Sequence, residues 1–189
     1  MDNSRRAATS RNYRAIVYFD RPGQENTNEV VDLVQTRFDE GDISKIIVAT
    51  TKGVTGLKFA KAFKGKVSTV AISHEKMEVD YRKEMEELGA KAAERSHLPF
   101  HAEGMDVVRD TLYTLGQGFK VALEIVLIAT DMGLVPPYNR VIAVGGTDRG
   151  SDTAIVARST TTAEAFTRDE TKRLEVREIL CMPLKKTWL

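Results

Sequence analysis

The sequence predicts an α/β protein with three α/β/α layers, in which helices cover both faces of a mostly parallel, doubly wound sheet. Over residues 15–88, short apolar runs alternate with helix-length amphipathic segments. Such alternation is typical of successive strand–helix–strand units. Residues 140–146 and 153–159 then read as two strands joined only by TDRGSD. We therefore also expect at least one antiparallel strand, at an edge of the sheet.

The first strand and helix are predicted between residues 15 and 41. AIVYFD (15–20) reads as a strand, and RPG (21–23) as a turn, because proline and glycine supply the backbone angles that turns need. Asn26 followed by Glu29 predicts a capping box at the start of a helix. The apolar face of this helix consists of Val30, Val31, Val34 and Phe38. We expect the helix to end before Gly41.

The next elements continue the alternation. KIIVAT (45–50) predicts a strand, residues 57–63 a helix and KVSTVAIS (66–73) the third strand. Residues 78–88 predict another helix, and a strand signal surrounds Ala92.

Two helices are expected in the second half of the chain, over 106–115 and 119–132, with GQG (116–118) as the break between them. The second helix is apolar nearly all round, so it belongs in the core or against another subunit. This suggests a homo-oligomer. The closing stretch VREILCMPL (176–184) is strand-like.

Glu124 lies inside this apolar helix. Burying an unpaired carboxylate is costly, so we expect Lys120, four residues earlier, to pair with it. A ligand contact is the alternative.

Composition excludes several classes of function. The 28 lysines and arginines balance 27 acidic residues, so nothing indicates a nucleic-acid or anionic membrane partner. The longest apolar tract is too short to span a bilayer. The single cysteine, Cys181, makes no internal disulfide and is expected in the core rather than as a nucleophile. With no leader pattern, a cytoplasmic protein is expected, with a flexible arm over 1–12 and one domain over 13–189.

Three glycine-bearing junctions carry the functional hypothesis: TTKGVTG (50–56), GQGFK (116–120) and GGTDRGSDT (145–153). The carboxyl ends of parallel strands meet at one edge of a sheet, where helix N-termini direct free N–H groups at ligands. We expect the three junctions to converge there around an anion. Each also has a simpler interpretation, as an N-cap, a helix stop and a hairpin turn respectively.

The first junction has the ingredients of a phosphate cradle. Thr50, Thr51 and Thr55 offer hydroxyl groups, Gly53 allows close approach of the backbone, and Lys52 adds a charge. The spacing matches neither a P-loop nor GxGxxG, so nucleotide hydrolysis is not supported.

Four blocks resemble the archaeal and bacterial proteins that share the fold of the pyruvate kinase C-terminal domain. They are YFDRPGQENT (18–27), VATTKGVTG (48–56), TLGQGFKVALE (114–124) and VIAVGGTDRGSDTAIV (141–156). The resemblance runs from residue 13 to 183, with a departure over 75–105. In pyruvate kinase the similar turn grips the phosphate of an allosteric sugar phosphate. This implies the same role here for Thr50, Thr51, Gly53 and Thr55, with the glycine loop 145–150 beside them.

The free-standing members of this family are expected to bind flavin mononucleotide (FMN). A pyruvate kinase is excluded, because its catalytic barrel alone takes about 250 residues, more than this chain contains.

The first hypothesis is an FMN-binding protein, and, if it is an enzyme, a flavin-dependent oxidoreductase. In it the threonines and the Gly53 N–H hold the phosphate, Gln117 and Lys120 reach the ring or ribityl oxygens, and Arg149 closes the mouth. The complete expected set is Thr50, Thr51, Lys52, Gly53, Thr55, Gly116, Gln117, Gly118, Lys120, Gly145, Gly146, Thr147, Arg149 and Gly150.

The alternative is a non-catalytic sensor of a phosphorylated metabolite. No catalytic pair is evident in the sequence, and the histidines at 74, 97 and 101 are scattered. Of these only His74, at the end of a predicted strand, is a candidate for chemistry. No metal site is expected.

Overall fold

Seven strands form one mixed sheet in the computed structural model, which describes residues 11–188. Their order is β1-β7-β6-β5-β2-β3-β4. The bounds are β1 Val17–Phe19, β2 Lys45–Ala49, β3 Thr69–Ile72, β4 Lys91–Ala93, β5 Arg140–Gly145, β6 Thr153–Arg158 and β7 Glu175–Pro183. Neighbouring strands are parallel except at β6, which is antiparallel to both β5 and β7. The predicted class, an α/β protein with a mostly parallel sheet, is confirmed.

The antiparallel strand lies inside the sheet, not at an edge as the sequence analysis expected. Residues 153–157 of β6 are buried, so this strand needs cover on both faces and a partner on both sides. The closing strand β7 supplies the second partner, and β1 then adds to β7. The edge strands are β1 and β4, each of three residues, and so short an edge offers little backbone to another chain.

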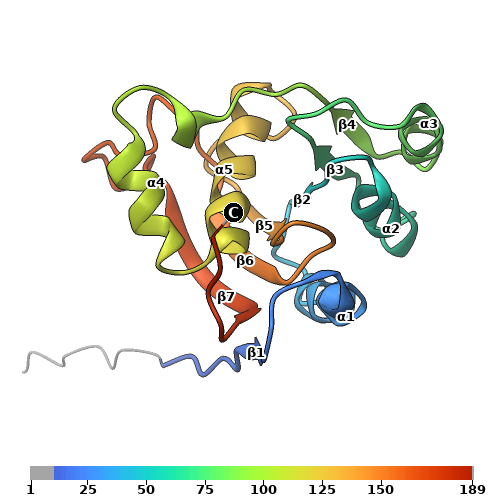
Figure 1. Ribbon diagram of the computed structural model, residues 1–189, viewed down its shortest axis with the longest axis horizontal. Helices are drawn as coiled ribbons and strands as arrows, with labels where there is room; N and C mark the ends of the chain where they lie inside the picture. Colours follow the sequence, from blue (N-terminus) through green and yellow to red (C-terminus); the bar gives the residue numbers. More distant parts are fainter. Residues whose placement is uncertain (1–10, 189) are drawn as a thin grey trace, which may run out of the picture.

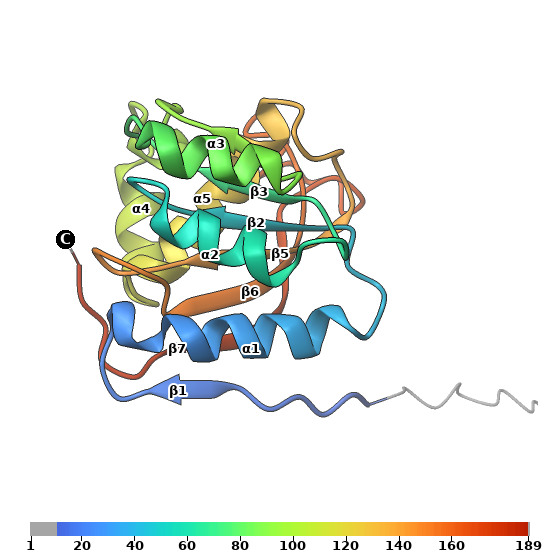
Figure 2. The ribbon, with the colours of Figure 1, turned by 90° about the vertical axis from the view of Figure 1, so that its right-hand side faces the viewer.

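Helices cover both faces of the sheet (Figures 1 and 2). On one face lie α1 (Thr27–Phe38), α2 (Val54–Ala62) and α3 (Val79–Glu87). On the other lies α5 (Gln117–Asp131), with α4 (Asp106–Tyr113) packed against it. Two short 3-10 helices, η1 (Gln24–Asn26) and η2 (Pro99–His101), complete the set.

Strand β2 shows how the sequence divides between the two cores. Ile46 and Val48 pack with α1 and α2, whereas Ile47 packs with α5. Successive side chains of a strand point to opposite faces, so a continuous apolar run is what a strand covered on both sides requires.

Helix α5 is buried by its own chain, as its apolar sequence predicts. Every residue from 118 to 130 except Val121 is buried, against the sheet, η2 and α4. A second subunit is therefore not needed to cover this helix, and the expected homo-oligomer stays a prediction without this support. Among the residues described, no helix is long and apolar enough to cross a membrane.

Helix α1 begins after Asn26 as predicted but without the predicted capping bonds, and two other helices begin at different residues. The capping box does not form: the Asn26 side chain donates to the carbonyl of Arg21 at 2.9 Å, and η1 leads directly into α1. Helix α2 begins at Val54 instead of 57, since Gly53, with φ of 108°, turns the chain abruptly. Helix α4 ends at Tyr113 and helix α5 begins at Gln117, so the break covers residues 114–116 instead of 116–118.

The expected strand around Ala92 exists as β4, and the arm expected over 1–12 lies, apart from two residues, outside the described part of the chain.

Two glycines allow α5 to lie directly on β5. A Cβ on Gly145 would overlap the carbonyl oxygen of Gly118 and lie 2.8 Å from the amide nitrogen of Ala122. A Cβ on Gly118 would in turn collide with Asp152 and Thr153. These two glycines, both expected in the ligand site, have a role in helix–strand packing.

We expect Gly145→Ala to lower the free energy of unfolding by about 3 kcal/mol, because the backbone atoms of α5 cannot move away from the new methyl group. Gly104→Ala is the control: its Cβ would meet open space, and only its φ of 81° costs about 1 kcal/mol. Denaturant unfolding measures both, and equal losses would contradict the packing role of Gly145.

Candidate functional site

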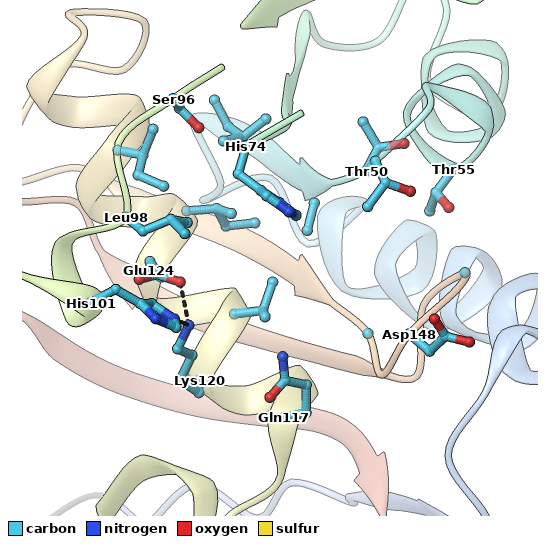
Figure 3. Close-up of a pocket in the computed structure, with 18 of the residues that line it drawn as sticks. Thr50, Thr55, His74, Ser96, Leu98, His101, Gln117, Lys120, Glu124 and Asp148 are labelled. Carbon is cyan, nitrogen blue, oxygen red and sulfur yellow. Dashed lines mark hydrogen bonds and ion pairs between the residues drawn. The ribbon is translucent and has the colours of Figure 1, made fainter. Parts of the chain in front are cut away.

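A cavity of about 270 Å³ opens at the carboxyl edge of β2, β3 and β5 (Figure 3). All three glycine-bearing junctions reach it, through Thr50, Gln117 and Gly150. Helix α5 forms one wall with Lys120 and Glu124, and the segment 96–101 crosses the same wall. The sheet edge therefore holds one pocket that unites segments distant in the sequence.

A second hollow, of about 650 Å³, continues outward from the first. The two share Thr50, Thr51, Thr55, Asp148 and Gly150, so they form an inner and an outer chamber that meet at the threonine bend. The outer chamber adds charged side chains of both signs and one aromatic ring: Lys52, Lys58, Arg149, Glu75, Glu78 and Tyr81.

The expected site residues fall into two groups. Those lining a chamber are Thr50, Thr51, Lys52, Thr55, Gln117, Lys120, Gly146, Arg149 and Gly150. Those lining neither are Gly53, Gly116, Gly118, Gly145 and Thr147. The second group shapes the backbone around the pocket.

Two groups of the expected phosphate cradle already have partners. The N–H of Gly53 donates to Oγ1 of Thr50 at 3.1 Å, which is the N-cap-like interpretation of this bend. The ammonium of Lys52 pairs with Glu75 at 2.7 Å on the exposed surface. Gly53 itself is required by its φ of 108° and by Tyr81, whose Cβ would lie 2.8 Å from an added Cβ.

Other donors at the bend remain available to a ligand. Leu57 is the first residue of α2 whose N–H bonds back to the bend, to the Gly53 carbonyl at 2.8 Å. The N–H groups of the preceding turn have no intrahelical acceptor, and the hydroxyl of Thr55 stands among them. Asp148 lies on the same side of the pocket as Thr55 (Figure 3), so a carboxylate faces this group of donors.

Asp152 holds the loop between β5 and β6, and the sequence analysis did not single it out. Its carboxylate is fully buried and accepts from the N–H of Gly23 at 3.2 Å, the N–H of Thr147 at 3.0 Å and the hydroxyl of Thr153 at 2.8 Å. Burial raises the pKa of this carboxyl, and the hydrogen bonds act in the opposite direction. Thr147 thus anchors the loop through its backbone.

Three polar side chains gather at the inner end of the cavity, opposite the threonines (Figure 3). Lys120 Nζ lies 2.6 Å from Oε2 of Glu124 and 2.7 Å from Nε2 of His101. The other oxygen of Glu124 accepts the N–H of Phe100 at 3.0 Å. The predicted Lys120–Glu124 pair is confirmed, with both side chains only 3% exposed.

His101 was passed over in the sequence analysis. It lies in segment 75–105, where the sequence resemblance is lost, and nothing in its local sequence connects it with Lys120. The pKa of its imidazole is lowered, first by burial of part of the ring and then by the charge of Lys120. The ring is therefore neutral at pH 7, and its Nε2 must accept because an ammonium only donates.

The remaining candidates fall as follows. His74 lines the inner chamber, whereas His97 pairs with Asp131 at 3.2 Å outside it. Cys181 is fully buried, as expected, and burial raises its pKa to about 12, so it stays a thiol. The described residues contain no group of three or more His, Cys, Asp or Glu side chains arranged to hold a metal.

No protein-family model matches the chain.

The lowered pKa of His101 predicts how the stability of the fold depends on pH. Below the ordinary value of about 6.5, the unfolded chain holds a proton that the folded chain does not, so stability falls as pH drops through this window. Gln accepts from Lys120 without titrating. We expect His101→Gln to lose less unfolding free energy than the wild type between about pH 7 and pH 5, measured by denaturant unfolding. Identical pH profiles would contradict a His101 ring that stays neutral beside Lys120.

Proposed function

We propose that this protein binds a phosphate-containing ligand at the threonine bend, and that the ligand is FMN. One observation carries the proposal: a pocket with hydrogen-bond donors at the N-terminus of α2, apolar walls in its middle and a buried lysine at its far end. Few convergent polar groups in an otherwise apolar pocket are typical of cofactor sites.

The phosphate end rests on the first turn of α2. Free N–H groups and the positive end of the helix dipole favour a phosphate there, and Thr51 and Thr55 add hydroxyl donors. Asp148 opposes such an anion. Arg149, which lines the outer chamber beside it, supplies a charge of the favourable sign.

The ring end rests on the inner chamber. Its walls are aliphatic, from Ala49, Ile72, Leu98, Val121, Ile125 and Ile128, and suit a flat aromatic ring. The side-chain amide of Gln117 lies in the wall of this chamber with its nitrogen toward the cavity (Figure 3), and it would donate to a ring or ribityl oxygen. These residues fit FMN, whose bound ring supplies one- or two-electron redox chemistry.

The proposed family is that of the pyruvate kinase C-terminal domain. The four resembling sequence blocks support it, and the mostly parallel sheet with an antiparallel strand agrees with such a fold. A flavin-dependent oxidoreductase would be one form of this function. NADH oxidation with a dye acceptor, assayed on the FMN-loaded protein, distinguishes such an enzyme from a protein that only binds FMN.

A sensor of a compact phosphorylated metabolite is the second candidate. The inner chamber, at about 270 Å³, is slightly smaller than the range of about 300–1,000 Å³ usual for ligand pockets, which favours a small ligand. Tight binding of glucose 6-phosphate without binding of FMN would select this candidate.

The phosphate grip is tested by comparing FMN with riboflavin, which lacks the phosphate. We expect Thr55→Val to weaken FMN binding about tenfold, because a hydrogen bond to a charged group contributes about 1.5–3 kcal/mol. Asp148→Asn should tighten FMN binding, since it removes a like charge and asparagine tolerates the residue's φ of 62°. Riboflavin affinity should change in neither variant.

Isothermal titration calorimetry measures these affinities, and Thr36→Val, on the exposed face of α1, is the matched control. Equal effects of Thr55→Val on FMN and riboflavin would place the phosphate elsewhere.

A further inference from the structure

The inner end of the cavity is closed by a pair of opposite charges that are almost completely shielded from bulk water. Lys120 and Glu124 are each 3% exposed, and their charged atoms are 2.6 Å apart. Both carboxylate oxygens are engaged, one by Lys120 and the other by the backbone of Phe100. Separating this pair would leave an uncompensated buried charge, which is strongly unfavourable.

This end of the cavity therefore has no net charge. The ammonium and the carboxylate cancel, and His101 contributes a neutral ring whose Nε2 accepts from Lys120. Nearby walls come from α4 through Tyr113 and from α5 through Gln117, neither of which adds a charge. Arg109 of α4 acts on His101 from a distance, but its own charge is balanced by Asp106 and Asp110.

Lys120 nevertheless keeps a donor for a ligand. An ammonium group has three N–H bonds, and Glu124 and His101 take two of them. A carbonyl oxygen can accept the third without displacing either partner. A carboxylate or phosphate in the same place would lie close to Glu124 and lose its own hydration, with no free positive charge to offset the loss.

We propose that the Lys120–Glu124–His101 cluster selects ligands whose inner end is an uncharged carbonyl or amide, and rejects ligands with a second anionic group there. The inference rests on the proposed function for the anionic end, at the threonine bend. The ligand class is then a monophosphate with an apolar middle and a neutral polar tip. Bisphosphates and phosphorylated carboxylic acids are excluded.

Two matched probes test this selection: 4-carbamoylphenyl phosphate and 4-carboxyphenyl phosphate. They share the phosphate and the ring and differ only in the charge of the far group. By calorimetry we expect wild-type protein to bind the amide at least tenfold more tightly than the carboxylate.

Glu124→Gln changes the charge balance while keeping the size of the side chain. The inner end then carries the uncompensated charge of Lys120, so the preference for the amide should fall at least tenfold. In the double variant Lys120→Met, Glu124→Gln both charges are gone. Rejection of the carboxylate should return, with weaker binding of the amide. A purely structural role would weaken both probes equally and leave their ratio unchanged.

Glu75→Gln is the control, because it removes the same charge from the outer chamber, where Glu75 pairs with Lys52. It should change the affinities of both probes by the same factor. If circular dichroism shows that Glu124→Gln does not fold, the proposal is tested by the ratio of the two probe affinities in the wild type and in the double variant.

The outcomes separate the two proposals. Equal binding of the probes to the wild type, or tighter binding of the carboxylate, overturns the selection while phosphate binding stands. Failure of both probes and of FMN to bind overturns the proposed function, and the selection with it.

Discussion

Helix α5 can lie on strand β5 only because neither Gly118 nor Gly145 has a side chain, and the rest of the site depends on this contact. The close approach buries the helix and carries Lys120 and Glu124 into the interior, where each charge must find its partner. It also brings Gly118 against Asp152, the carboxylate that holds the loop after β5 by hydrogen bonds to its backbone. A single packing constraint thus sets both the depth of the inner chamber and the position of its glycine loop.

Charges are organised differently at the two edges of the sheet. At the amino ends of β2 and β5, the buried Arg37 bonds Glu178 and Asp42, and Arg140 also contacts Asp42. This network ties α1 to the sheet. At the carboxyl edge the charges surround open space, paired at the inner end and mixed in sign at the outer. One edge is thus closed by its ion pairs, whereas the other keeps donors that face a cavity, which is where a parallel sheet presents its ligands.

Much of the fold followed from local patterns. The expected strands and helices all exist, including the weakly signalled β4, because apolar periodicity reports which face of an element is buried. The predictions were wrong where a side chain or a strand pairs with a partner that the local sequence does not reveal. Asn26 bonds Arg21 instead of capping α1, and β6 lies inside the sheet because β7, about twenty residues later, pairs with it. For the candidate site, the convergence of the three glycine junctions on one cavity was predicted, whereas the packing of Gly118 and Gly145 and the pairing of Lys52 with Glu75 were not.

By itself the sequence determined the elements, the turns after β2 and β5, and the Lys120–Glu124 pair, since residues four apart on a helix are neighbours in any fold. Only the tertiary structure decided that His101 meets Lys120, that Asp152 holds the loop, and that the threonine bend faces α5 across a cavity. The physical reason is the distance along the chain over which each kind of interaction acts. Periodicity and helix geometry act over a few residues, whereas strand order and the approach of distant loops depend on how all apolar faces are buried together.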